Sequence, residues 1–224
     1  MHSTRIIHLI TTIRFGGAEN QLLILVREQV TLGFDIQVAY LKERPELENE
    51  FVLAGARILH NVANKNLATQ LIVLRRILKD QNIVVHSHLP RAELIARFAL
   101  NKNRFIVTRH NSEKFFPKLP NIFSSFLSRV VTKRASAIIA ISKAVAKFLI
   151  SQKELINLEK LRIIHYGYTP SFNIDRLTQK KYIQNLQEIY IGTISRLTQQ
   201  KDLPTLIRAF SMFINDFPNS KLVI

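Results

Sequence analysis

The chain has 224 residues, 47% of them hydrophobic, which is enough for a sizeable core and one to two domains. It has no cysteine, which excludes disulfides and thiolate metal sites and favours a reducing compartment. The formal net charge of +16 indicates an anionic partner without identifying it. No run approaches the roughly 18 apolar residues of a membrane-spanning helix, and the N-terminal apolar run is too short for a secretory signal. A cytoplasmic protein is therefore expected, and contact with the inner face of a membrane stays open.

Short β-rich runs alternate with longer helical runs along most of the chain. Strands are expected at 6–10, 35–40, 57–59, 83–86, 105–108, 137–141 and 161–164. Helices are expected at 18–32, 51–54, 67–80, 92–100, 120–134 and 143–151. This order predicts an α/β fold with a parallel, doubly wound sheet and helices on both faces. Ligands of such folds bind at the carboxyl ends of the strands.

Polar and glycine residues follow several of these strands. Gly16 and Gly17 stand between the first strand and its helix, where they either let a ligand approach the backbone or make a purely structural turn. The turn lacks the G-x-G-x-x-G dinucleotide pattern. His86 and His88 follow the fourth strand and 108–111 the fifth, so the turn and these strand ends can form one site. No third ligand accompanies the His-x-His pair, so no metal is predicted.

A basic stretch runs from Lys102 to Arg134, with eight basic residues against Glu113 alone. Apolar residues recur at helical spacing within it. One interpretation is an amphipathic helix that lies on an anionic membrane surface. The other is an ordinary surface helix whose apolar side packs on the sheet. The cations expected to meet a membrane are Lys114, Lys118, Arg129 and Lys133.

Ser142 directly precedes a helix, and this position predicts an N-cap with no ligand role. Further along, a strand at 189–194 leads to Arg196 and Lys201 and then to a helix from Pro204. Two cations beside a helix start suit a diphosphate. The polar segment 171–187 is expected to be a linker between a first domain at 1–170 and a second Rossmann-like domain at 188–224, which is expected to be only begun.

The chain resembles glycosyltransferase family 4, whose members have the two-domain GT-B fold. The likeness rests on four stretches taken in order: Phe15-Gly-Gly-Ala-Glu19, Val107-Thr-Arg-His110, Ala137-Ile-Ile-Ala-Ile-Ser142, and Ile191-Gly-Thr-Ile-Ser-Arg196-Leu-Thr-Gln-Gln-Lys201 running into Leu206-Ile-Arg-Ala-Phe210. The resemblance implies retaining, metal-independent transfer of a sugar, such as a hexose, from a nucleotide-diphosphate sugar. It also implies an acceptor that binds the first domain, such as a lipid-linked or lipopolysaccharide glycan, as in polysaccharide biosynthesis. No cofactor is expected, because the nucleotide sugar is a substrate.

By this resemblance, Arg196 and Lys201 hold the donor diphosphate and stabilise the leaving group, whose negative charge a metal-free site must neutralise with protein groups. Gly16 and Gly17 match the loop that approaches the reacting sugar and diphosphate. His110 matches the catalytic-site histidine near the sugar.

The chain departs from the family at Ser195, where a glycine is usual, and in ending at Ile224 before the donor-sugar glutamates and the nucleobase pocket of the family. The leading hypothesis is therefore an incomplete glycosyltransferase that is inactive alone. An alternative is a non-catalytic binding protein derived from a glycosyltransferase N-terminal domain. Nucleic-acid binding is not expected, because no reading module and no basic–aromatic repeat is present.

Overall fold

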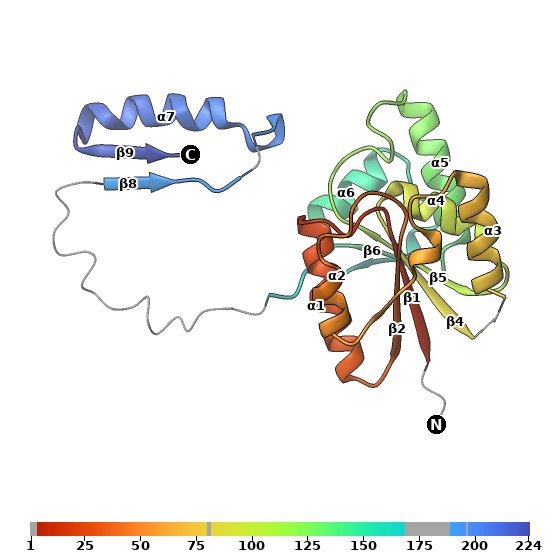
Figure 1. Cartoon of the computed structure of the whole chain (residues 1–224). Coiled ribbons are helices and arrows are strands. Elements are labelled where there is room, and N and C mark those ends of the chain that lie inside the picture. Colours follow the sequence, from red (N-terminus) through yellow and green to blue (C-terminus); the bar gives the residue numbers. More distant parts are fainter. Residues whose placement is uncertain (1–3, 80–81, 169–188, 196) are drawn as a thin grey trace. The chain divides into compact units, whose positions relative to one another are not determined.

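The computed structural model describes residues 4–79, 82–168, 189–195 and 197–224. The chain divides into two compact units, Met1–Tyr168 and Thr169–Ile224 (Figure 1). The predicted linker at 171–187 and Arg196 lie outside the described residues.

The first unit contains a seven-stranded, all-parallel sheet in the order β3-β2-β1-β4-β5-β6-β7. Its strands are β1 (Arg5–Ile10), β2 (Asp35–Tyr40), β3 (Arg57–Ile58), β4 (Ile83–His88), β5 (Arg104–Arg109), β6 (Ala137–Ala140) and β7 (Leu161–Ile163). The order reverses direction between β1 and β4, as in doubly wound sheets. The predicted α/β fold is confirmed.

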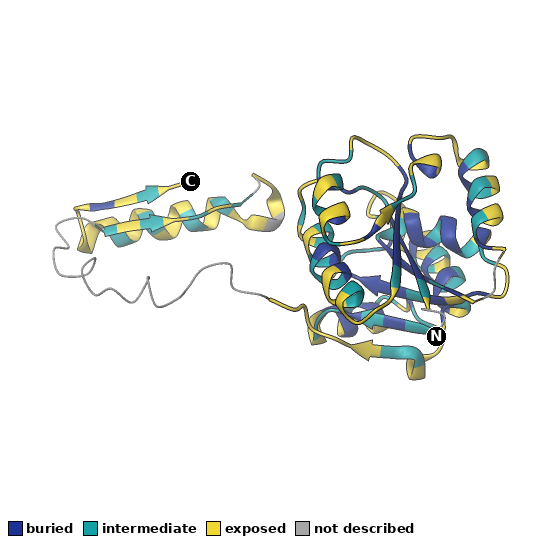
Figure 2. Cartoon of the chain, turned by 60° about the horizontal axis from the view of Figure 1, so that its bottom comes forward, coloured by how far each residue is buried: buried dark blue, intermediate teal, exposed yellow. Residues whose placement is uncertain are grey.

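Helices cover both faces of this sheet (Figure 1). The described helices are α1 (Gly17–Thr31), α2 (Glu48–Leu53), α3 (Leu67–Ile77), α4 (Pro90–Ala99), α5 (Asn121–Arg134) and α6 (Lys143–Ser151), with 3-10 turns η1 (His60–Val62) and η2 (Leu158–Lys160). One core cluster joins the sheet to α3, α4 and α5, and another joins it to α1 and α2. Buried residues concentrate in the strands and on the inward sides of the helices (Figure 2).

Side chains of a strand point alternately to the two faces of the sheet, and this alternation separates two groups of polar residues. On β1, Ile7 and Leu9 belong to the cluster under α3–α5, whereas Ile6 and Ile10 belong to the cluster under α1. The even-numbered His8 therefore lies on the α1 face. By the same alternation the α1 face also receives the polar side chains His86, His88 and Thr108.

Three predicted boundaries were wrong. β4 continues to His88, so the His-x-His pair belongs to the strand and does not follow it. The pair is buried and hydrogen-bonded there, which a spacing rule for loops cannot detect. α3 ends at Ile77, before the predicted end, although no glycine or proline marks the stop. α2 begins at Glu48 and is longer than the short turn that was expected.

The second unit contains the predicted strand and helix, and a second strand follows the helix. They are β8 (Ile189–Gly192), α7 (Leu203–Asp216) and β9 (Ser220–Val223), with the 3-10 turn η5 (Gln199–Lys201) before α7. β8 and β9 pair in parallel. Most of the described side chains of this unit are exposed (Figure 2).

Every helix in the described part of the chain is too short or too polar to cross a bilayer.

Candidate functional site

A cavity of about 360 Å³ lies on the α1 face of the seven-stranded sheet, within the first unit. One wall is apolar and comes from α1 and from the isoleucines of the later strands, among them Leu25, Ile106 and Ile139. The other wall carries ring nitrogens and hydroxyls at the carboxyl ends of β4, β5 and β7, where open parallel sheets bind their ligands. An apolar pocket with a few convergent polar groups is the usual form of a small-molecule site.

Four histidines gather at or directly behind this polar wall: His86, His88 and His110 line the cavity, and His8 lies behind them, bonded to His88. His8, His86 and His88 are buried, and His110 is partly exposed at the cavity. The parallel register explains the meeting, because His8 lies opposite His86 in the β1–β4 ladder and His88 lies opposite Thr108 in the β4–β5 ladder. The sequence pattern pointed to His86, His88 and His110, but nothing in it indicated that His8 joins the group from the middle of the first strand.

Hydrogen bonds connect these rings to one another. His8 Nδ1 lies 3.1 Å from His88 Nε2, and His88 Nδ1 lies 3.0 Å from His110 Nε2. The far nitrogen of His8 lies 2.7 Å from the Gln29 Oε1, and the far nitrogen of His110 bonds the Tyr166 hydroxyl. His86 is not part of this series of hydrogen bonds, and its Nε2 lies 2.7 Å from Thr108 Oγ1 instead.

The site is electrically neutral at its histidines. Burial lowers the pKa of His8 to about 4, despite the opposing effect of its hydrogen bond to the Gln29 side chain. Burial, and to a smaller extent the Arg109 charge, lower the pKa of His110 to about 4. Burial raises the pKa of Tyr166 to about 12, with a smaller contribution from the Glu19 carboxylate. Near neutral pH these imidazoles are therefore uncharged and the tyrosine keeps its proton.

Three of the histidines, His8, His86 and His88, have ring nitrogens within 4.8 Å of one another, which is the one such grouping of potential metal ligands among the described residues. His8 and His88 already use both ring nitrogens in hydrogen bonds. A metal ion would have to displace these bonds, and the donor set offers it no carboxylate. The geometry therefore favours a hydrogen-bonded group over a metal centre.

The predicted glycine turn opens α1. Gly16 is the N-cap residue with an extended backbone, and Gly17 is the first helical residue and is exposed. A methyl group added at Gly16 would meet the Glu19 carboxylate at 2.3 Å, whereas a methyl group at Gly17 would meet nothing within 4 Å. The turn thus leaves open space in front of the helix start, and an acid already lies near the positive end of the helix dipole.

The same turn is tied to its surroundings on both sides. Thr12 Oγ1 donates to Glu19 at 2.8 Å, and the backbone N–H of Phe15 donates to Glu46 at 2.9 Å. Phe15 itself is 71% exposed. The backbone of the turn is therefore held in place by hydrogen bonds, while the Phe15 ring faces solvent. The turn lies at the start of α1, the helix that lines the cavity.

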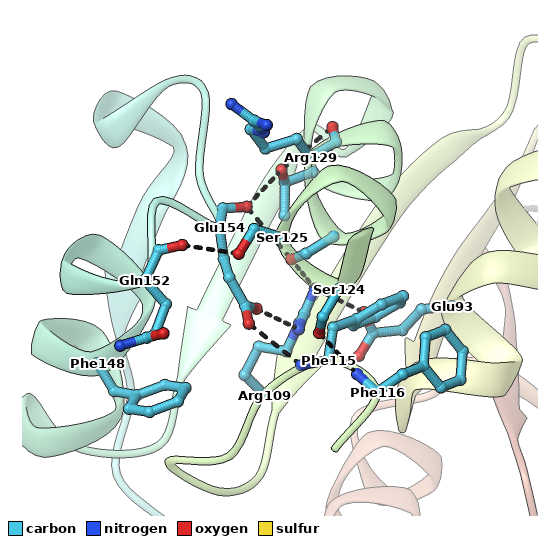
Figure 3. A network of polar contacts seen from close by, with 12 residues as sticks. Glu93, Arg109, Phe115, Phe116, Ser124, Ser125, Arg129, Phe148, Gln152 and Glu154 are labelled. Atoms are coloured by element: carbon cyan, nitrogen blue, oxygen red, sulfur yellow. Dashed lines mark hydrogen bonds and ion pairs between the residues drawn. The ribbon is translucent and has the colours of Figure 1, made fainter. Parts of the chain in front are cut away.

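On the opposite face of the sheet, Arg109 forms a buried polar network (Figure 3). Its two terminal nitrogens each lie 3.1 Å from a carboxylate oxygen, one of Glu154 and one of Glu93. Its guanidinium also donates to Ser128 at 2.9 Å and lies over the Phe115 ring. Glu154 in turn accepts the Phe115 backbone N–H at 3.1 Å. The network fixes the segment between β5 and α5.

This network explains why the expectation for the basic helix fails in part. The buried side of α5 carries Ser124, Ser128 and Thr132, whose hydroxyls bond the Phe116 N–H and the Glu154 backbone. Three apolar residues at the start of the helix face solvent instead: Ile122, Phe123 and Phe126 are 78%, 62% and 55% exposed. The interpretation that this whole apolar side packs on the sheet is therefore wrong for the first turns.

The four cations proposed for a membrane surface lie on this segment with different exposure. Lys118 and Lys133 are exposed, whereas Lys114 and Arg129 are intermediate. Together with Leu119, Ile122, Phe123 and Phe126 they form what we call the α5 surface.

The remaining predicted site residues belong to the second unit. Lys201 is exposed in η5, one residue before Asp202, which adopts a left-handed backbone at the start of α7. Arg196, its predicted partner on a diphosphate, lies outside the described residues. Elsewhere, the predicted N-cap role of Ser142 is confirmed, because its Oγ accepts the Val145 N–H at 3.2 Å.

Comparisons with known proteins agree with this architecture. The sequence pattern described as Glycosyltransferase Family 4 matches residues 15–172. HepE from Anabaena, in complex with UDP and glucose, superposes with a TM-score of 0.73 at 16% identity, over 99% of this chain and 61% of HepE. A second HepE structure, with UDP-glucose, gives 0.69 at 18% identity, over 98% of this chain and 60% of that one. The chain thus spans about three fifths of HepE.

A glycosyltransferase from Rickettsia africae gives a TM-score of 0.66 at 15% identity, over 99% of this chain and 68% of that chain. At these identities the superpositions show the fold alone. No curated protein matched the chain. The family pattern, which covers the Gly16-Gly17 turn, the histidine cavity and the α5 surface, shows that the chain belongs to glycosyltransferase family 4.

Proposed function

We propose that the protein acts in glycosyl transfer from a nucleotide-diphosphate sugar to a glycan or lipid-linked acceptor, with retention of configuration and without a metal. The observation that carries this proposal is the family 4 pattern over residues 15–172. The binding of UDP and glucose by HepE, a protein of the same fold, supports a uridine diphosphate sugar as the first donor to test.

In this proposal the first unit contributes the acceptor side. His110 faces the sugar from the cavity, and the open space at Gly17 admits the donor close to the backbone. Lys201, together with Arg196, neutralises the diphosphate as it leaves. Because His110 is neutral near pH 7, it serves as a hydrogen-bonding group toward the sugar and not as a cation toward phosphate.

The proposal is tested by incubating the protein with radiolabelled UDP-glucose and a membrane lipid extract, and by measuring label in the lipid phase and released UDP. Transfer is expected from a protein that joins this chain to a complete donor domain, and Lys201→Ala should lower its rate about 100-fold, as for loss of one charge-stabilising group. These 224 residues alone are expected to be inactive. Lys221→Ala, a second lysine of the same unit outside the proposed site, is the matched control. Release of UDP without labelled lipid would indicate another acceptor. If the protein binds the lipid fraction but turns over no nucleotide sugar, the alternative of a non-catalytic binding protein is favoured.

We further propose that the α5 surface rests on the cytoplasmic face of an anionic membrane. Exposed phenylalanines beside lysines are the composition of interfacial membrane contacts, in which apolar rings enter the headgroup region and cations meet anionic lipid. Vesicles containing phosphatidylserine should therefore sediment the protein at low salt. Phe123→Ser combined with Phe126→Ser should abolish this, whereas Phe98→Ser, an exposed phenylalanine on α4, should not. Equal sedimentation of both variants would refute the assignment of the surface.

A further inference from the structure

A continuous chain of hydrogen bonds crosses the α1 face of the sheet and ends at the cavity. It runs from Gln29 on α1 through His8, His88 and His110 to Tyr166, and each of its links joins a ring nitrogen to the next group. His8 and His88 are buried at 0% and 1% exposure, so water does not compete for these links. Packing the core does not require buried histidines, because aliphatic side chains fill a core without burying polar atoms that need partners.

The chemistry at the Gln29 end sets the direction of every bond. The Gln29 Oε1 is an acceptor, so His8 must donate to it from Nε2–H. A neutral imidazole carries one proton, so the Nδ1 of His8 is bare and accepts from His88 Nε2–H. The same step repeats: His88 Nδ1 accepts from His110 Nε2–H, which leaves His110 Nδ1 as the acceptor of the Tyr166 hydroxyl.

The amide of Gln29 at the end of the hydrogen-bonded chain also excludes proton transfer along it. A carboxylate in place of Gln29 would stabilise a charged ring, as carboxylates do beside catalytic histidines. An amide carbonyl does not take up a proton at ordinary pH, so protons cannot leave the chain at this end. Burial moreover holds the pKa of His88 well below its ordinary value. These hydrogen bonds therefore orient the rings and do not conduct protons.

We propose that Gln29, His8 and His88 are positioning residues that hold His110 as a neutral imidazole protonated at Nε2, with its bare Nδ1 turned to the cavity as a hydrogen-bond acceptor. The Tyr166 hydroxyl occupies that acceptor now, and Tyr166 is 38% exposed. A ligand that replaces it must bring a hydroxyl or N–H donor, as a sugar does. An unprotonated phosphate oxygen offers only lone pairs and is rejected. This choice of a sugar ligand rests on the proposed function.

The tautomers can be measured directly by long-range ¹H–¹⁵N correlation spectra of the full chain labelled with ¹⁵N-histidine at pH 7. His8, His88 and His110 should each show a protonated Nε2 and a bare Nδ1. His88→Leu breaks the chain in the middle and should lower the Nε2–H to Nδ1–H ratio of His110 about fivefold, the effect of losing one neutral hydrogen bond. His86→Leu is the matched control, because His86 is similarly buried two residues earlier on β4 but bonds Thr108 instead.

A His110 protonated at Nδ1, or on both nitrogens, in the wild-type protein would overturn the proposal whether or not the variants fold. The same holds if His88→Leu and His86→Leu leave the His110 tautomers alike. In Tyr166→Phe, which exposes Nδ1, glucose should shift the His110 Nδ1 signal, and inorganic sulfate, which carries no proton at pH 7, should not. A response to sulfate alone would refute the acceptor role. A failure of glycosyl transfer with the expected tautomers would refute only the proposed function.

Discussion

Glu93 gives the buried Arg109 network a pH dependence that can be measured. One guanidinium faces two buried carboxylates. Glu154 accepts hydrogen bonds from Arg109 and from the Phe115 backbone, whereas neither oxygen of Glu93 has a hydrogen-bond donor with good geometry. Burial raises the pKa of Glu93 to about 7; the Arg109 charge opposes this, and the Glu154 charge adds to it. The second carboxyl of the network is thus held toward its neutral form.

The sign of the effect on stability follows from the raised pKa. Because folded Glu93 takes up a proton more readily than unfolded Glu93, folding is favoured at low pH and loses stability as the pH rises from about 4.5 toward 7 and above. A shift from 4.5 to about 7, at roughly 1.36 kcal/mol per pKa unit, corresponds to about 3 kcal/mol. The side chain is fully buried, so solvent screening does not reduce this figure.

Glu93→Gln keeps the shape of the protonated acid and cannot ionise. We expect the variant to match the wild type within about 1 kcal/mol at pH 4.5 and to exceed its free energy of unfolding by up to about 3 kcal/mol at pH 8. Urea unfolding followed by circular dichroism at several pH values between these limits measures the difference. The control is Glu159→Gln, an exposed glutamate in η2. A difference between Glu93→Gln and wild type that does not change with pH would refute the reasoning.

Three further predictions concern single contacts. Arg109→Met leaves the buried carboxyl groups of Glu154 and Glu93 without their cation and should lower the free energy of unfolding by about 3–5 kcal/mol in urea titrations. Ser142→Ala removes the cap of α6 and should cost about 1 kcal/mol in the same assay, whereas Ser151→Ala at the far end of that helix should cost less. Tyr166, with its pKa raised to about 12, should keep its proton well above pH 10, and Tyr166→Phe should remove a late step from an alkaline ultraviolet titration; an unchanged titration would contradict the raised pKa.

Local pattern was sufficient for much of the fold. The alternation of apolar strands and helical runs predicted the order of elements, and Ser142 was recognisable as a cap because capping depends on neighbours three residues away. The patterns that predict turns and helix ends involve residues only a few positions apart, so they can be recognised in a single sequence. The same is true of the Gly16-Gly17 turn before α1, whose position was correct.

The contacts that make the site are long-range, and spacing could not reveal them. His8 meets His88 across 80 residues, and Arg109 meets Glu154 across 45. His8 sits in an apolar strand where nothing local distinguishes it from a core residue. Only the sheet order, with β1 beside β4, brings it against His88, which lines the cavity. The interpretation of α5 was partly wrong for a related reason. Inward-facing hydroxyl side chains of this helix form hydrogen bonds with Glu154 and Arg109, and the pattern of residues along the helix does not show that those two residues are buried.

Two consecutive residues at the carboxyl end of β5, the last strand residue and the one after it, therefore serve different purposes on opposite faces of one sheet. Arg109 turns to the α5 face, where it fixes the segment that carries the α5 surface, and His110 follows at the cavity on the α1 face. The two are coupled through charge, since Arg109 contributes to the lowered pKa of His110. Burial is the main cause of the neutral state of His110, the Arg109 charge adds to it, and this neutral state is what the hydrogen-bonded chain from Gln29 requires. The same arginine thus stabilises the first unit through its buried ion pairs and adds to the neutral character of the histidine at the cavity.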